Sequence, residues 1–341
     1  MNGIAHLQKK TGPKTWLILF AFLSFAVSHF GDRINPYYFD VIITIGINIV
    51  LAVSLNLVNG YTGQFSLGHA GFMAVGAYVS ASITLFLGGW FQQRFGTGMV
   101  GDATLYLGAL ITGGLGAALA GLMVGVPSLR LKGDYLAIVT LGFGEIIRVI
   151  VQNTEAVGGS RGLSIPVRTT TFFWTYLAAA ITVYVVVLLV HSTYGRGFLT
   201  VRDDEIAAEA MGINTTKYKV LAFVVGAFFA GIAGGLYAHF KQFIHPEGFN
   251  FLRSVDIVVI VILGGMGNTP GVILAAILLT ILPEGLRALS SWEALPIWLR
   301  HIAQNRMILY SLLLIVLMLT RPQGLFTGGG RLKKWFRRVE A

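Results

Sequence analysis

Ten long apolar segments follow one another along the chain and constrain its fold more than any other feature of the sequence. A helix needs about 20 apolar residues to cross a bilayer, and only helices and closed barrels satisfy their backbone hydrogen bonds in lipid. The segments therefore predict an all-α integral membrane protein, a polytopic bundle of about ten transmembrane helices that forms a single domain over residues 1–341. They lie at Trp16–Phe30, Tyr38–Val58, Ser66–Gly88, Leu105–Val126, Tyr135–Val151, Phe172–His191, Tyr218–His239, Phe251–Gly264, Val272–Leu286 and Met307–Thr320.

The composition agrees with a membrane protein and excludes several other classes. Hydrophobic residues make up 55% of the chain and charged residues only 12%, whereas a soluble domain carries about 25% charged residues. The chain has no cysteine, which excludes disulfides, thiolate chemistry and Cys-based metal sites. Its net charge of +10 indicates basic loops that face the cytoplasm and an anionic leaflet. We expect a lipid bilayer around the chain and no nucleic acid among its partners.

The basic residues predict which side of the membrane each loop occupies. If the N-terminus is inside, the cytoplasmic segments carry 15 of the 25 Lys and Arg residues and the external segments carry 9, with Arg148 inside a span. This bias follows the positive-inside rule and predicts that both termini are cytoplasmic, the second as a basic tail at 321–341. We expect the first segment, Trp16–Phe30, to be retained as a span rather than removed as a signal peptide.

A run of Gly, Asn, Thr and Pro interrupts the apolar region 251–286 near 264–271. The whole region is too long for one span, and its halves are short for two. Broken helices are tolerated in membranes where they are buried in protein or line a cavity. The sequence leaves open whether this region forms two spans or a re-entrant arrangement.

Two of the predicted helices carry small residues at four-residue spacing, which places these residues on one face. Lipid gives helices no hydrophobic reason to associate, so their backbones must approach closely to gain contacts. The stripes therefore predict helix-packing surfaces rather than a chemical site. They consist of Gly113, Ala117, Gly121 and Gly125 on one helix, and of Gly226, Ala230 and Gly234, with Ala227, Gly231 and Gly235 beside them, on the other.

The predicted cytoplasmic loop 192–217 contains the signals of a short helix. Asp203 or Asp204 can cap its N-terminus, and Gly212 is placed to end it. A helix of about two turns is too short to be stable alone, so it needs a surface on which to dock, although a solvated charged loop is the alternative. Its predicted apolar face is Ile206, Ala210 and Ile213, with Ala207 and Ala208 beside it and a separate acidic stripe of Glu205 and Glu209.

Glu145 and Arg148 fall inside the predicted span Tyr135–Val151. At 1.5 Å per residue, Glu145 lies about 15 Å along this helix, near the middle of the bilayer. A charge there usually faces a cavity or a partner, and the spacing allows an ion pair with Arg148. Two interpretations stay open: the pair lines a translocation path, or it fixes helix packing or a subunit contact. Three further carboxylates lie nearer to span ends, where we expect structural roles: Asp40, Asp256 and Glu284.

A second Gly-rich break, Gly60–Ser66, lies between two spans and is followed by His69. Such a break can expose backbone groups to a polar ligand, so Gln64, Ser66 and His69 are candidate path residues. A tight turn between antiparallel spans explains the glycines equally well. No second His or carboxylate stands at metal-ligand spacing beside His69, and no nucleophile set is recognisable, so we expect neither a metal site nor an enzyme active site.

Four sequence blocks, at Asn56–Phe72, Leu131–Arg148, Arg202–Ile213 and Leu263–Asn268, follow one another over nearly the whole chain. In content and order they closely resemble the permease subunits of ATP-binding-cassette (ABC) importers for branched-chain amino acids. The resemblance implies a bacterial inner-membrane permease that works with two ABC ATPase subunits, a second homologous permease and a periplasmic substrate-binding protein. The chain has no G-x-x-x-x-G-K-[ST] phosphate loop. ATP and Mg are therefore expected on the ATPase subunits, and no cofactor on this chain.

The resemblance also implies a role for the short helix within Asp203–Ile213. In such importers it is the coupling helix, which docks in a groove of the ATPase. The family pattern Glu-Ala-Ala-x-x-x-Gly is matched at Ala207, Ala208 and Gly212, but Ile206 stands in the Glu position. Two alternatives stay open: an ABC permease for urea, short amides or another amino acid, and a self-sufficient ion-coupled transporter, which would not need such a helix.

Overall fold

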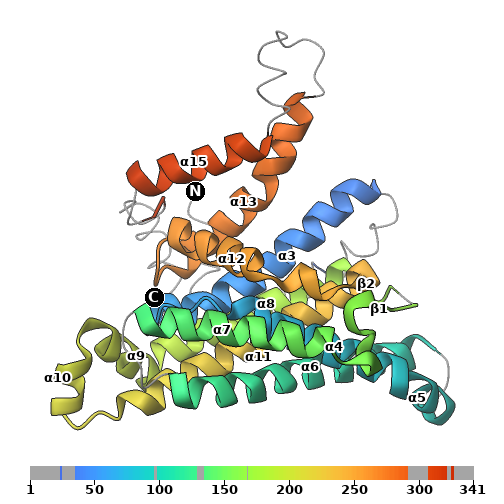
Figure 1. Cartoon of the computed structure of the whole chain (residues 1–341), viewed down its shortest axis with the longest axis horizontal. Coiled ribbons are helices and arrows are strands. Elements are labelled where there is room, and N and C mark those ends of the chain that lie inside the picture. Colours follow the sequence, from blue (N-terminus) through green and yellow to red (C-terminus); the bar gives the residue numbers. More distant parts are fainter. Residues whose placement is uncertain are drawn as a thin grey trace, which may run out of the picture.

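The computed structural model describes residues 24, 35–95, 98–128, 134–166, 168–290, 306–320 and 324–325. Most of these residues lie in helices, several of which run alongside one another (Figure 1). The predicted all-α fold is confirmed. The helices are α3 (Pro36–Asn56), α4 (His69–Ser82), α5 (Gly88–Phe95), α6 (Met99–Ser128), α7 (Asp134–Gln152), α8 (Phe172–His191), α9 (Thr193–Asp203), α10 (Glu205–Ala210), α11 (Thr215–Lys241), α12 (Phe251–Gly264), α13 (Thr269–Ser290) and α15 (Arg306–Thr320).

Helices occur at nine of the ten predicted segments, and the other, Trp16–Phe30, lies outside the described residues. Seven helices of the described part are long and apolar enough to cross a membrane. The helices α12, with 14 residues, and α15, with 15, are shorter. At 1.5 Å per residue α12 covers about 21 Å, less than the bilayer core of about 30 Å. The polytopic membrane fold is therefore confirmed, whereas the number of ten spans stays a prediction.

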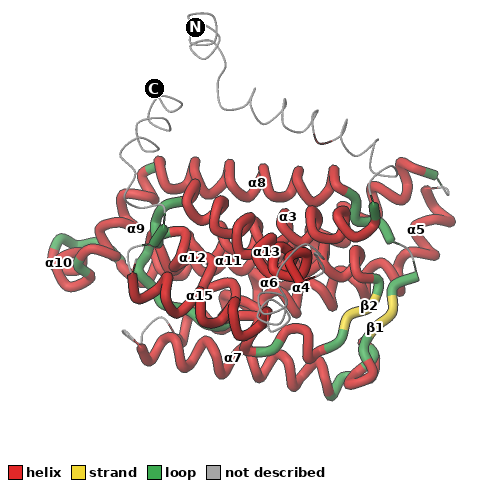
Figure 2. The backbone as a smooth tube through the Cα atoms, turned by 90° about the horizontal axis from the view of Figure 1, so that it is seen from above, coloured by secondary structure: helices red, strands yellow, loops and turns green. Residues whose placement is uncertain are grey.

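The centre of the bundle is built from α4, α6 and α11 (Figure 2). Their glycines let the backbones touch: a Cβ atom added to Gly76 of α4 would lie 2.2 Å from the Cα of Gly231 on α11. One added to Gly113 of α6 would lie 2.7 Å from the carbonyl oxygen of Gly76. Such close approach lets these helices gain the dispersion contacts on which association in lipid depends. The small-residue stripes are packing surfaces, as predicted.

Two helices lie on opposite sides of this centre, α7 on one side and α8 on the other (Figure 2). Only 17% of the residues in the apolar part of α7 and 22% of those in α8 are buried. The remaining surface of these helices is available to lipid or to another protein.

The two ends of the bundle differ. The helices α9 and α10 project at one end, here called the α10 end (Figure 1). At the opposite end lie α5 and a small antiparallel ribbon of β1 (Leu163–Ser164) and β2 (Phe243–Ile244), in which Leu163 pairs with Ile244. We call this the ribbon end.

Candidate functional site

The α10 end carries the predicted short helix with both of its caps. Of the two candidate N-caps, Asp204 is the one used: its Oδ1 accepts hydrogen bonds from the backbone N–H groups of Ile206 and Ala207 at 2.9 and 3.0 Å. Gly212 follows the helix with φ +80°, and two backbone hydrogen bonds complete a Schellman motif there. Strong signals at both ends thus define a helix of only six residues.

One face of α10 is apolar and exposed. The side chains of Ile206 and Met211 are 73% and 82% exposed, and Ala207 and Ala210 are exposed with them. We call these four residues the α10 face. Ala208 does not belong to it, although we expected it beside the docking surface. It is fully buried because that side of α10 packs against the chain's own α9 and α11.

The acidic residues of α10 hold the helix in place. Lys219 of α11 donates from Nζ to Glu205 Oε1 at 2.6 Å, and its side chain is only 8% exposed. Thr215 donates from Oγ1 to Glu209 Oε1 at 2.9 Å. The predicted acidic stripe therefore anchors α10 to the start of α11. These bonds fix the direction in which the α10 face points.

A second feature is the non-helical segment 62–68, which joins a π-helical turn at Leu57–Tyr61 to the start of α4. In an apolar interior each polar backbone group needs a partner. Side chains from three other places in the chain supply such partners: Asn59 accepts from the Ser66 N–H and donates to the Ser66 carbonyl, Thr140 accepts from the Leu67 N–H, and Ser254 accepts from the Ala70 N–H.

The three candidate path residues near this segment are all buried in the chain. Gln64, Ser66 and His69 are 4%, 1% and 2% exposed, and His69 Nε2 hydrogen-bonds to Ser54 Oγ at 2.9 Å. None of them faces a surface of this subunit, so their place on a translocation path stays a prediction. Sequence reasoning missed the residues that support this segment: Asn59, Thr140 and Ser254. The sequence around each of them shows only that a polar side chain lies near or within an apolar helix, which does not indicate its partner.

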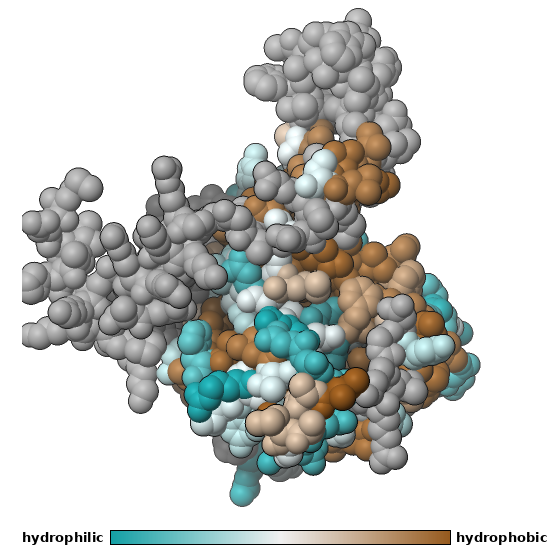
Figure 3. Space-filling view, turned by 90° about the vertical axis from the view of Figure 1, so that its left-hand side faces the viewer, coloured by the Kyte–Doolittle hydropathy of each residue, from teal (hydrophilic) through white to brown (hydrophobic). Residues whose placement is uncertain are grey.

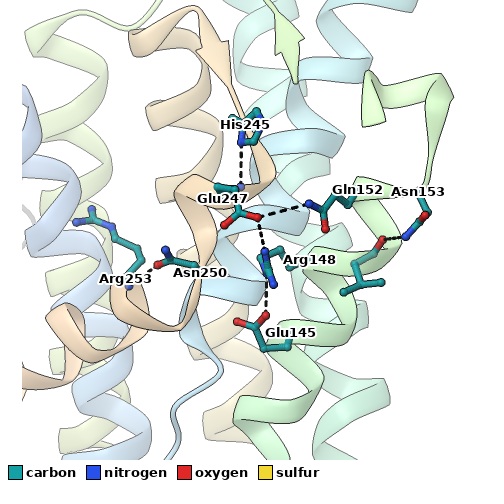
Figure 4. A network of polar contacts seen from close by, with 9 residues as sticks. Glu145, Arg148, Gln152, Asn153, His245, Glu247, Asn250 and Arg253 are labelled. Atoms are coloured by element: carbon teal, nitrogen blue, oxygen red, sulfur yellow. Dashed lines mark hydrogen bonds and ion pairs between the residues drawn. The ribbon is translucent and has the colours of Figure 1, made fainter. Parts of the chain in front are cut away.

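The third feature is an ion-pair network near the ribbon end (Figure 4). Arg148 donates from Nε to Glu145 Oε2 at 2.7 Å, which is the predicted pair, and from Nη1 to Glu247 Oε1 at 2.6 Å. Gln152 Nε2 lies 3.4 Å from the same Glu247 oxygen. Sequence reasoning missed Glu247 because it comes from the segment between β2 and α12, far along the chain. Two carboxylates around one guanidinium give the network a net negative charge.

The carboxylates near span ends fall into two groups. Asp40 pairs with Lys241 at 2.6 Å, and Glu284 accepts a hydrogen bond from the hydroxyl of Tyr37. These contacts fit the structural roles that we expected. Asp256 instead lies on the exposed side of α12.

The short helix α12 is tied into the bundle by a polar contact. Arg253 Nη2 donates to Asn48 Oδ1 at 2.9 Å, and Asn48 Nδ2 donates to Thr280 Oγ1 at 2.9 Å. The contact joins α12, α3 and α13. In the described ranges, no group of three or more His, Asp or Glu residues is arranged to hold a metal ion.

Comparison with known proteins decides the family. Residues 37–318 match the family model described as "Branched-chain amino acid transport system / permease component". The chain belongs to this permease family. The high-affinity branched-chain amino acid transport system permease protein LivM of Salmonella typhimurium is 35% identical, over 92% of this chain and 75% of that protein. LivM of Escherichia coli is 36% identical, over 82% and 67%. No solved structure matches.

The family assignment confirms the resemblance that the sequence blocks predicted. A branched-chain amino acid permease component is a transport subunit, in keeping with the polytopic membrane fold. A second kind of relative, LivH of Escherichia coli, is 26% identical over 68% of this chain and 79% of that protein, and it carries the same transport-system name as LivM. The LivM proteins of Salmonella typhimurium and Escherichia coli, at 35% and 36% identity, are more similar to this chain than LivH is.

Proposed function

We propose that the chain is one permease subunit of an ABC importer that moves branched-chain amino acids across the bacterial inner membrane, powered by separate ATPase subunits. The observation that carries this proposal is the similarity to LivM, which extends over 92% of the chain. The chain's lack of a phosphate loop supports an energy source on another subunit. ATP and Mg would bind there rather than on this chain.

The α10 face is the proposed contact with the ATPases. Ile206 and Met211 are exposed together on a capped six-residue helix, and exposed apolar side chains that cluster in this way usually mark an interaction site. A transporter that works as a single chain would not need such a site. The anchoring of α10 to α11 through Glu205 and Lys219 gives the face a fixed orientation. Docking of the ATPases here would place the α10 end on the cytoplasmic side. The bias of basic residues places both termini on the same side.

A second, homologous permease and a periplasmic binding protein complete the proposed assembly. Escherichia coli has two related proteins, LivM and LivH, that are both named permeases of a high-affinity branched-chain amino acid system. A pair of similar but non-identical permeases is therefore the arrangement that we propose. The binding protein would deliver substrate at the ribbon end, opposite α10.

We also propose that the network around Arg148 lies on the translocation path. Leu141, Glu145, Arg148 and Gln152 follow one another at helical spacing along one flank of α7, whereas Ile146 and Ile150, which are 52% and 59% exposed, lie on another. Glu145 and Glu247 keep exposed fractions of 33% and 54%. Glu145 and Arg148 lie within the apolar helix Tyr135–Gln152, and partly exposed charges in such a helix favour water or a protein partner over lipid. The polar flank therefore suits a path that the second permease completes.

The composition and activity of the isolated complex test the proposed function. Tagged and purified from its own cells, the chain should carry two ATPase chains and a second permease, identified by intact mass. Reconstituted with the binding protein, this complex should accumulate labelled leucine only when ATP is present. The chain alone should neither hydrolyse ATP nor accumulate leucine. Leucine uptake by the chain alone, driven by a proton or sodium gradient, would instead establish a secondary transporter.

Glu145→Gln tests the path assignment. Arg148 keeps Glu247 as a partner in this variant, and the groups are partly exposed, so we expect the yield of folded complex to stay normal. Removing the charge from the path should lower leucine uptake about tenfold or more, equivalent to about 1.4 kcal/mol in the barrier. Glu155→Gln, just beyond the end of α7, is the matched control and should transport normally. Unchanged leucine uptake by Glu145→Gln would show that the network around Arg148 does not lie on the translocation path.

A further inference from the structure

The two Gly-rich breaks in the sequence lie against each other at the α10 end. The part of the first break that lies in this contact is Gly60–Gly63, which follows α3. The part of the second is Gly264–Gly267, which joins α12 to α13. The N–H of Gly267 donates to Asn56 Oδ1 at 2.9 Å. A Cβ atom added to Gly60 would lie 2.2 Å from the nitrogen of Gly267, so the two turns touch through their backbones.

Both turns depend on backbone conformations that favour glycine. Gly63, Gly265 and Gly267 have φ angles of +68°, +93° and +79°. A π-helical turn at Leu57–Tyr61 overlaps the start of the first break, and such turns are frequent at functional sites. Few side chains therefore hinder a change of backbone direction where α3 ends and where α12 turns into α13.

Arg202 of α9 reaches between the two turns. Its Nη1 lies 3.4 Å from the carbonyl oxygen of Gly60, to which it donates, and 3.2 Å from the position of a Cβ added to Gly267. Its Nε and Nη2 donate to Asp203 Oδ1 at 3.0 and 2.9 Å. Arg202 stands in the last turn of α9, directly before Asp203 and the N-cap of α10. One side chain thus connects the short helix to both breaks.

A surface hollow of about 390 Å³ opens beside this contact. Such a volume falls within the range of small-molecule sites, which is about 300–1,000 Å³. Figure 3 looks onto the α10 end, where hydrophilic residues gather on the face. Two larger apolar side chains at the hollow, Phe65 and Met266, are 37% and 53% exposed. The hollow is lined by Asn59, Gly60, Gly63, Phe65, Arg202 and Met266.

We infer that this hollow is the cytoplasmic mouth of the translocation path, and that Arg202 is the positioning residue that links it to α10. The inference rests on the proposed function. When the ATPases move the α10 face, α10 carries Asp203 and Arg202 with it, because these residues adjoin its N-cap. Arg202 then shifts against Gly60 and Gly267, and the two glycine turns change the width of the mouth between Phe65 and Met266.

Arg202→Met tests the link, because methionine keeps an unbranched chain but cannot donate to Gly60 or Asp203. In the whole complex we expect the ATPases to co-purify and hydrolyse ATP as before, since the α10 face is intact. Leucine transported per ATP hydrolysed should fall about tenfold or more. Arg196→Met, an exposed arginine on the same helix, is the matched control and should stay coupled.

Two results for Arg202→Met would overturn the inference. Normal transport per ATP hydrolysed would show that Arg202 does not link α10 to the hollow. Loss of the ATPases from the complex would show that Arg202 is a docking residue. Neither result touches the proposed function, which fails only if the unmodified complex lacks ATPases or ATP-driven uptake.

The absence of cysteine from the chain permits a direct test of the mouth. Phe65→Cys and Met266→Cys are combined, and a cleavable bifunctional thiol reagent joins the two positions in the complex. Linking should stop leucine uptake while the ATPases remain bound, and cleavage of the linker should restore uptake. The two single variants, treated in the same way, are the controls. Full uptake by the linked complex would exclude the hollow as the mouth.

Discussion

Ala210→Glu should yield a stable permease that no longer co-purifies with its ATPases. Ala210 is exposed on the α10 face, between Ile206 and Met211, and a glutamate there places an unpaired charge against the groove that would receive the helix. Desolvating such a charge at an interface costs about 2–5 kcal/mol, which weakens association by orders of magnitude. Because α10 lies beyond the apolar spans, their packing should not change. Co-purification and thermal unfolding of the same preparations measure the two effects.

Three comparisons isolate the α10 face as the cause. Ala207→Arg, on the same face, should behave like Ala210→Glu. Ala208→Glu should differ, because Ala208 is fully buried and the charge would disrupt the packing of α10 on its own chain. Lys334→Glu in the basic tail should have little effect. If Ala210→Glu kept its ATPases while Lys334→Glu lost them, the coupling element would lie in the tail and the assignment of α10 would be wrong.

The limits of the sequence are visible within this short helix. Its ends could be predicted because caps are local: Asp204 and Gly212 act through neighbouring backbone groups. Two residues of its exposed face, Ile206 and Ala210, could also be predicted, because four-residue spacing places them on one side of a helix. Ile213, the third residue of the predicted apolar face, lies beyond Gly212 and is only partly exposed. The burial of Ala208 and the partner of Glu205 depend on α11, which the local pattern does not describe.

The spans and the network around Arg148 show the same difference between features set by neighbouring residues and features set by distant ones. Long apolar segments identified nine helices because burial in lipid demands an apolar surface over a whole helix. The start of α4 at His69 rather than Ser66 could not be predicted, since the non-helical segment 62–68 depends on distant partners such as Thr140 and Ser254. Likewise, the pair of Glu145 with Arg148 follows from helical spacing, whereas Glu247 joins them only through the fold.

Gly234→Ala should cause a large loss of stability, because it adds a methyl group where two helices of the bundle centre touch. A Cβ atom at Gly234 of α11 would lie 2.0 Å from the carbonyl oxygen of Met73 and 2.8 Å from the nitrogen of Ala77, both on α4. Because both neighbours are backbone atoms, no change of rotamer can relieve the overlap, and α4 and α11 must move apart. Overpacking of this kind costs about 1–3 kcal/mol or more. In lipid the separation also removes the close contacts on which helix association depends.

Thermal unfolding of the purified complex in detergent measures this effect against a matched variant. Gly108→Ala on α6 makes the same chemical change where the added Cβ has no atom within 4 Å. It should leave the Tm unchanged or raise it slightly, because Ala favours a helix over Gly by about 1 kcal/mol. Gly234→Ala should lower the Tm by about 5 °C or more. Equal Tm values for the two variants would mean that α4 and α11 do not meet through their backbones at Gly234, and that the small-residue stripe on α11 is not the contact that holds the centre of the bundle together.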